Sequence, residues 1–205
     1  MRFSTILLLG LPLLVACSDV KDDEDDHGHH DYDHGLITAI VLDFESDSGE
    51  TMTASWEDPT GDGSSVTVDD IMLTAGASYD VSVQVLNQLE DPVEDVTIEI
   101  LELADEHQFF FTGAGVTGPG SNSSSAVVEH SYNDTDNQGL PLGVDNIFNA
   151  LAAGSGDMEV TLRHMPPESG QPIKYDGMAD TVAADGFSAI GGSNDIQVTF
   201  NVQVN

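Results

Sequence analysis

Short runs in which apolar and polar residues alternate recur along the chain, and this two-residue period constrains its fold more than any other feature. The clearest run, 196–204, places Ile, Val, Phe, Val and Val at every second position. The run 79–85 has the same alternation. A period of two puts the apolar side chains on one face of a β-strand. Further strand-like runs are 36–44, 51–56, 66–68, 71–73, 107–111, 126–132, 142–148 and 158–164.

Turn residues separate these runs, because Gly, Asn, Asp and Ser fill most of the gaps between them. Several short strands joined by such turns are typical of an antiparallel sandwich. One segment has a helical period: Asp91-Pro92 is typical of a helix start, and apolar residues then recur through Ala104. The Gly-rich stretch 168–194 is expected to be a long loop. The sequence therefore predicts a mainly β domain, 36–205, of the immunoglobulin-like sandwich class with one short helix.

The N-terminus has the form of a bacterial lipoprotein signal. Arg2 precedes an apolar run that ends in Leu14-Val15-Ala16-Cys17. The run is too short to cross a membrane, and small residues before a cysteine are typical of a lipobox. We expect cleavage after residue 16, lipidation of Cys17 with fatty acyl chains such as palmitate, and anchoring in the cell envelope, on the periplasmic or surface face of the outer membrane. The alternatives are a secretory signal whose cysteine is incidental, or an apolar start that is fortuitous and no signal at all.

Cysteine and charge counts narrow the function. Cys17 is the only cysteine, which excludes a disulfide scaffold and any site that needs several Cys ligands. The chain has 37 acidic and 4 basic residues, a formal net charge of −33. Such a chain repels nucleic acid and attracts cations. A nucleic-acid partner is therefore excluded.

Residues 17–35 have almost no apolar side chains and are expected to form a disordered tether. Four histidines are interleaved with aspartates in it. Imidazole and carboxylate together suit zinc, copper or nickel. We interpret this cluster as a metal-capture segment; the alternative is a solvated, pH-sensitive spacer. The four histidines are His27, His29, His30 and His34.

Three further histidines belong to the domain. His107 follows Glu106 at the end of the expected helix, and His164 lies at the end of an expected strand. If folding brings these two together, Glu106 or Asp105 would complete a zinc-type site. For each of these histidines and for His130, the alternative is a hydrogen-bonded imidazole of the core or the sheet edge. Arg163 is expected to bind a carboxylate in a bidentate manner.

Two turns have the oxygen-rich pattern of calcium loops. The second of them presents Asn133, Asp134 and Asp136, followed by Gly139, and the first spans residues 58–63. Calcium binds six to eight oxygens in such flexible arrangements. Neither turn has the glutamate that closes an EF-hand loop. Asp, Asn and Gly are also the residues that a tight turn requires, so a purely conformational role is the alternative.

Six short segments of the chain form a recognisable set: Leu36-Ile37-Thr38, Leu86-Asn87, residues 104–111, Asp134-Thr135-Asp136, and residues 139–143 and 162–166. Through them the chain resembles a family of short, largely uncharacterised bacterial lipoproteins that share an ADEHQFF segment and an LRHxP strand end. Some members are described as type 1 periplasmic binding domains, a fold that needs β–α alternation over two lobes. The resemblance implies a lipoprotein and supplies no catalytic residues. The resemblance extends over most of the mature chain.

Motifs of catalysis are missing from the sequence: there is no GxSxG, HExxH or phosphate-binding loop. We therefore expect a protein that is not an enzyme. The favoured interpretation is a membrane-anchored binding or accessory module for a divalent transition metal, with an outer-membrane receptor or another envelope protein as partner. The alternative is a structural or interaction lipoprotein whose loops are stabilised by calcium and which has no role in metal transfer.

Overall fold

The computed structural model of the protein describes residues 36–205, and all structural statements below concern these residues. The expected signal peptide, Cys17, and the histidines His27, His29, His30 and His34 lie outside them. Between residues 36 and 205, no helix has the length and apolar character needed to cross a bilayer.

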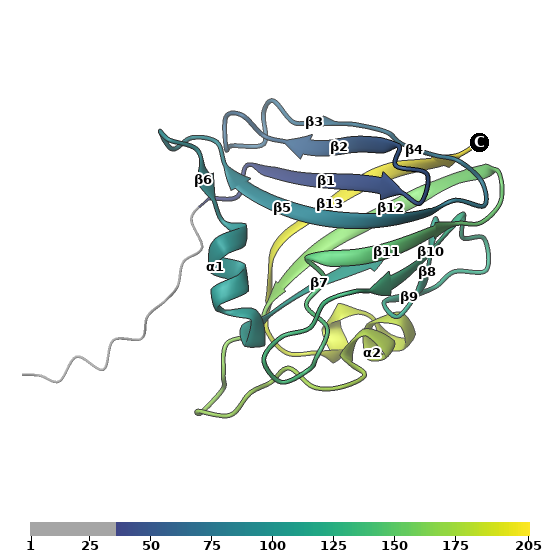
Figure 1. Ribbon diagram of the computed structural model, residues 1–205. Coiled ribbons are helices and arrows are strands. Elements are labelled where there is room, and N and C mark those ends of the chain that lie inside the picture. The colour runs from purple at the N-terminus through teal and green to yellow at the C-terminus, as the bar shows by residue number, and fades with distance from the viewer. Residues whose placement is uncertain (1–35) are drawn as a thin grey trace, which may run out of the picture. The chain divides into compact units, whose positions relative to one another are not determined.

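Two β-sheets face each other, as the alternating pattern predicts (Figure 1). The larger sheet has nine strands in the order β3-β2-β1-β5-β11-β10-β8-β9, with β6 paired to β5. Its strands are β1 (Ala39–Ser46), β2 (Thr51–Glu57), β3 (Thr67–Val68), β5 (Ser78–Asn87), β6 (Glu94–Asp95), β8 (Val116–Gly118), β9 (Ser121–Asn122), β10 (Val128–Tyr132) and β11 (Asp145–Ala150). The smaller sheet has the order β4-β13-β12-β7: β4 (Ile71–Leu73), β13 (Ser193–Val204), β12 (Gly154–His164) and β7 (His107–Thr112). Most neighbouring strands are antiparallel; β8–β10 and β4–β13 are parallel.

The core lies between the two sheets and consists of the residues that the two-residue period selects. In β5, Val81, Val83 and Val85 are buried, whereas Asp80, Ser82 and Gln84 are exposed. Phenylalanines fill the middle of this core. The rings of Phe111 and Phe148 pack edge to face, with their centroids 5.2 Å apart. The mainly β sandwich predicted from the sequence is confirmed.

Strand β7, at the edge of the smaller sheet, is buried on both faces, which explains its run of three phenylalanines. Phe109 and Phe111 belong to the core between the sheets, whereas Phe110 packs in a second cluster with Met165 and Met178. This second cluster includes one side of α2 (Met178–Asp185), which packs against the smaller sheet at its β7 edge (Figure 1).

The expectation of a structureless loop from 168 to 194 was wrong, because the segment contains α2 and the 3₁₀ turn η2 (Phe187–Ala189). Two glycines with positive φ, Gly177 and Gly186, bound α2. Between them, Met178 and Val182 are one turn apart and are buried against Phe110. The helical spacing of these apolar residues was too short to be recognised in a segment so rich in glycine.

The predicted helix starts later than expected. Residues 94–95 form β6 and pair with β5, so α1 covers only Thr97–Glu102. Asp95 accepts a hydrogen bond from the Thr97 backbone N–H at 3.1 Å, which fixes the turn into the helix. A 3₁₀ turn, η1 (Ala104–Glu106), then leads directly into β7. The order α1–η1–β7 places His107 at the first residue of a core strand.

Candidate metal centre

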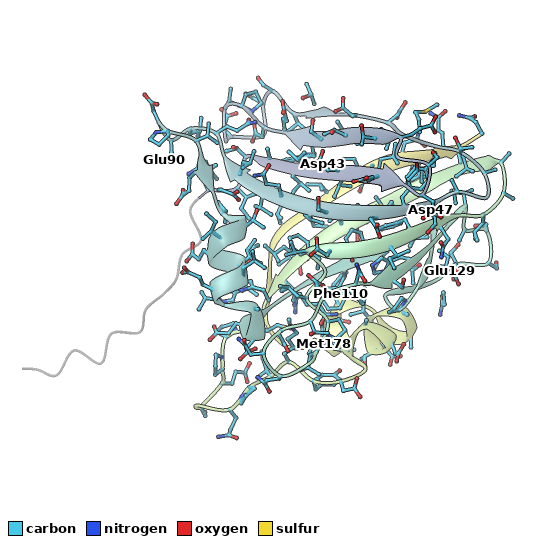
Figure 2. The ribbon with its side chains drawn as sticks, viewed as in Figure 1. Asp43, Asp47, Glu90, Phe110, Glu129 and Met178 are labelled. Atoms are coloured by element: carbon cyan, nitrogen blue, oxygen red, sulfur yellow. The ribbon has the colours of Figure 1, made fainter. Side chains whose placement is uncertain are left out.

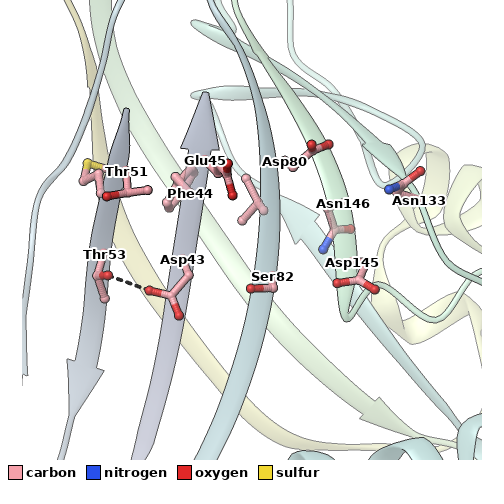
Figure 3. A pocket seen from close by; sticks show the side chains of 12 residues that line it. Asp43, Phe44, Glu45, Thr51, Thr53, Asp80, Ser82, Asn133, Asp145 and Asn146 are labelled. Carbon is pink, nitrogen blue, oxygen red and sulfur yellow. Dashed lines mark hydrogen bonds between the residues drawn. The ribbon is translucent and has the colours of Figure 1, made fainter. Parts of the chain in front are cut away.

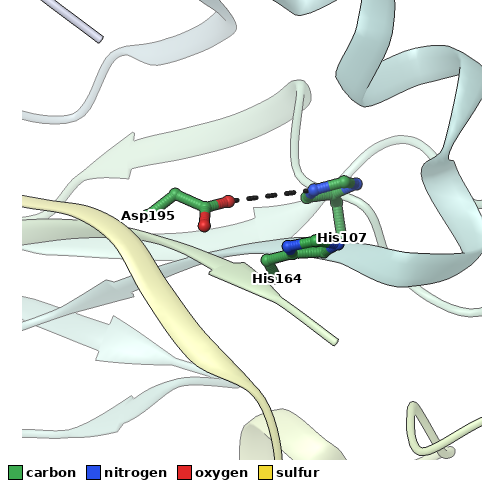
Figure 4. Close-up of side chains that lie close together, drawn as sticks. All are labelled: His107, His164 and Asp195. Carbon is green, nitrogen blue, oxygen red and sulfur yellow. Dashed lines mark ion pairs between the residues drawn. The ribbon is translucent and has the colours of Figure 1, made fainter. Parts of the chain in front are cut away.

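Histidines 107 and 164 occupy directly opposite positions on two paired strands. The antiparallel register of β7 and β12 places His107 across from His164. Directly opposed side chains in such a pair have Cβ atoms about 4.5–5.5 Å apart. The two imidazole rings stack with centroids 4.6 Å apart and an interplanar angle of 10° (Figure 4). The structure therefore brings together the two histidines whose meeting the sequence left open.

Asp195 joins the two histidines because of a β-bulge between β12 and β13. Leu162 pairs with Ile196 and Arg163 with Asn194, so Asp195 is the extra residue. A bulge bends its strand and redirects a side chain. The Asp195 carboxylate lies 3.8 Å from Nε2 of His107 (Figure 4). Gly192 permits the preceding loop to approach β12 closely, since its φ is +80° and a Cβ there would overlap the His164 carbonyl oxygen.

Together these three residues form a candidate metal-ligand set. One ligand atom from each of His107, His164 and Asp195 lies within 4.8 Å of the other two. Within residues 36–205, this is the one group of three or more His, Cys, Asp or Glu side chains with that property. Two imidazoles and one carboxylate suit zinc with an open fourth position, and they also suit iron(II). The residues present could thus hold a divalent metal ion.

The hydrogen bonding of His107 orients it as a ligand would be oriented. Its Nδ1 lies 2.9 Å from the carbonyl oxygen of Leu103. A carbonyl only accepts hydrogen bonds, so Nδ1 carries the hydrogen and the lone pair of the neutral ring is on Nε2. That nitrogen faces Asp195. Metal-binding histidines usually donate their second N–H to a carbonyl or carboxylate, which fixes the ring. His107 is fully buried, whereas His164 and Asp195 keep about 16% and 15% of their side chains exposed.

Glu106, which the sequence offered as the third ligand, lies beside the centre. Its Oε2 is 3.7 Å from Nε2 of His164, but the group of three contains Asp195 instead. Asp105, the other carboxylate considered, accepts a hydrogen bond from the Asn137 backbone N–H. Sequence reasoning missed Asp195 because a bulge has no reliable sequence signal. The one clue was its place after Gly191-Gly192, immediately before the alternating run.

His130 is a hydrogen-bonded imidazole of the core, which was the alternative to a role as metal ligand. Its Nε2 lies 2.9 Å from Oδ1 of Asn146, and its ring packs against Phe111 and Phe148. Burial lowers the pKa of His130 to about 4, although the bond to Asn146 opposes this shift. The imidazole is therefore neutral at physiological pH and belongs to the hydrophobic core.

Arg163 binds carbonyls and an amide, and the expected bidentate pairing with a carboxylate was wrong. Its Nε donates to the Gly191 carbonyl at 2.9 Å, Nη2 to the Ile190 carbonyl at 3.2 Å, and Nη1 to Oδ1 of Asn194 at 2.7 Å. Three donors of the guanidinium are therefore taken up by oxygens of the 190–194 segment.

The turn expected to bind calcium uses its carboxylates inside the protein. Asp134 accepts three backbone hydrogen bonds, from the N–H groups of Gly143, Val144 and Asp145. Asp136 forms a buried ion pair with Lys174 at 2.8 Å. Burial raises the pKa of Asp136, but Lys174 and two backbone N–H groups outweigh it and hold the pKa below its usual value. Calcium at Asn133, Asp134 and Asp136 stays a prediction.

An acidic groove of about 610 Å³ crosses the outer face of the larger sheet (Figure 3). The strand registers place Glu45 opposite Asp80, and Asp43 and Asp145 on either side of Ser82. Burial, together with the charges of Asp134 and Asp80, raises the pKa of Asp145. The two basic residues between 36 and 205, Arg163 and Lys174, are buried elsewhere. No Lys or Arg side chain of this region therefore neutralises the negative charge of the groove. The sticks in Figure 2 show other acidic side chains, Glu90, Asp47 and Glu129 among them, reaching out from the ribbon.

Compared with models of protein families, with curated proteins and with solved structures, the chain matches none of them.

Proposed function

We propose that this protein is a membrane-anchored bacterial lipoprotein whose β-sandwich binds one divalent transition metal ion, zinc or an ion of similar preference, as a binding or accessory module of the cell envelope. The observation that carries the proposal is the convergence of His107, His164 and Asp195, with ligand atoms within 4.8 Å of one another. Two imidazoles and a carboxylate are a preferred ligand set of zinc.

The surroundings of the three ligands support binding. The ring of His107 is held by the Leu103 carbonyl, so one ligand is oriented before any ion arrives. A site with preoriented ligands loses less entropy on binding than a disordered cluster does. The large acid excess also raises the local concentration of cations around the domain.

The N-terminal sequence supports the envelope location and offers a second group of ligands. A lipid on Cys17 would hold the domain at a membrane, and the histidines between residues 27 and 34 would lie on the same chain as the buried centre. In this arrangement the N-terminal histidines collect ions weakly and the sandwich retains one of them. A receptor or another envelope protein is the expected partner.

Metal analysis of the full chain, purified from its native membrane, tests the proposal. We expect about one zinc equivalent to remain when the four N-terminal histidines are replaced by glutamine, and none after the further change His164→Gln. Calorimetric titration of the same proteins measures the affinity. Equal metal content and affinity with and without His164→Gln would reject the domain site. Mass spectrometry of Cys17 tests lipidation independently, and an unmodified thiol would reject the anchor.

A further inference from the structure

Arg163 and Lys174 are the two basic residues of residues 36–205, and each is buried against a backbone segment that carries metal ligands. We infer that both are positioning residues of the metal centre: Lys174 fixes the corner that bears Glu106 and His107, and Arg163 fixes residues 190–194, which lead into Asp195 at the start of β13. The inference rests on the proposed function.

Lys174 holds the η1–β7 corner through two of its three donors, and the third pairs with Asp136. Its Nζ donates to the His107 carbonyl at 2.7 Å, to the Ala104 carbonyl at 3.1 Å, and pairs with Asp136 at 2.8 Å. An ammonium group has three N–H donors, so none is left over. The two carbonyls are at the start of η1 and immediately after it, so the backbone on both sides of Glu106 is fixed.

These contacts complete the restraint of His107. Its ring is held through Nδ1 by the Leu103 carbonyl, and its own carbonyl is held by Lys174. Its strand position is set by pairing with His164. Backbone and ring of this fully buried ligand are therefore both fixed before metal binds.

Arg163 plays the same part for Asp195. It lies next to His164 on β12 and donates to the carbonyls of Ile190 and Gly191 and to the side chain of Asn194. These three acceptors lie in the five residues that precede Asp195. The planar guanidinium presents its donors in a fixed fork, so it holds the loop in one arrangement relative to β12. Arg163 precedes His164 and Asn194 precedes Asp195, so the hydrogen bond between Arg163 and Asn194 links the backbone of the two ligands.

Fold stability alone does not account for these choices. Burying a charged group carries a large desolvation penalty, and well-packed apolar residues of similar volume are often as stabilising as a buried ion pair. In a chain with 37 acidic residues, both cations of the domain donate to a backbone carbonyl of a candidate ligand or of a residue within four positions of one. A geometric role at the metal centre explains that placement.

Zinc affinity and the absorption spectrum of bound cobalt(II) test the inference, measured on the full chain with the four N-terminal histidines replaced by glutamine. One variant is Lys174→Met combined with Asp136→Leu, which removes both buried charges together. The other is Arg163→Lys, which keeps the charge but loses the fork. Val81→Ala, in the core of the other sheet, is the control for lost stability.

We expect zinc affinity to fall by about 10- to 100-fold in both positioning variants, as for other residues that orient metal ligands. The cobalt spectrum should change as well, whereas Val81→Ala should lower the melting temperature and leave affinity and spectrum unchanged. Wild-type affinity and spectrum in the positioning variants, or losses no larger than those of Val81→Ala at equal loss of stability, would overturn the inference while the proposed function stands. If the parent chain itself binds no zinc, the proposed function fails, and the inference with it.

Discussion

Replacing Asp195 by asparagine should remove most of the stabilisation that zinc gives to the folded domain. Asparagine has nearly the same shape, and the carboxylate is about 15% exposed, so packing is preserved while the ligand charge is lost. Changing residues that only orient metal ligands weakens binding by about 10- to 100-fold, so losing a direct ligand should cost at least about 100-fold. That factor corresponds to about 2.7 kcal/mol of zinc-linked stability at saturating zinc.

Thermal unfolding with zinc and with a chelator measures this difference. For a domain of this size, 1 kcal/mol shifts the melting temperature by roughly 2–4 °C, so zinc should raise it by about 5–11 °C more in the wild type than in Asp195→Asn. Zinc bound by the N-terminal histidines does not disturb the assay, because ligands held equally by folded and unfolded chains do not change stability. The change Asp180→Asn, at an exposed position of α2, is the matched control. An equal zinc-induced shift in Asp195→Asn and the wild type would refute the reasoning.

Three other outcomes follow from the buried and crowded charges. Lys174→Met should lower the free energy of unfolding in urea by about 3–5 kcal/mol, because it leaves Asp136 buried without its partner; adding Asp136→Leu should recover part of this loss. The folded pKa of His130 is below its unfolded value, so stability should fall as pH drops from about 6.5 to 4, by at most about 1.4 kcal/mol per pH unit. The change His130→Leu should flatten that dependence in urea titrations at several pH values, and an unchanged slope would contradict it. Burial and the neighbouring carboxylates Asp134 and Asp80 raise the pKa of Asp145. Asp145→Asn should therefore stabilise the fold at pH 7 by less than about 1 kcal/mol, and this gain should disappear below about pH 4. A loss of stability at pH 7 would argue against repulsion between these carboxylates.

The sequence by itself determined the class of fold and most of the strands. A two-residue apolar period puts one face of a strand in the core whatever the topology, so Val81, Val83 and Val85 could be assigned before the structure was known. The pattern did not extend to α2, where the period covers only two turns between Gly177 and Gly186, nor to the start of α1, where pairing with β5 overrides the helical start at Asp91-Pro92.

The candidate metal centre shows most clearly which features follow from the sequence and which require the folded chain. The sequence identified His107 and His164 by residue type and by their places at strand ends, but their meeting depends on the register of β7 and β12, which is set by packing over the whole sheet. Asp195 enters through a bulge one residue wide, and Arg163 and Lys174 reach ligand-bearing segments 27 or more positions away in sequence. Local composition fixes which side chains a strand can offer, whereas long-range pairing decides which of them share a site.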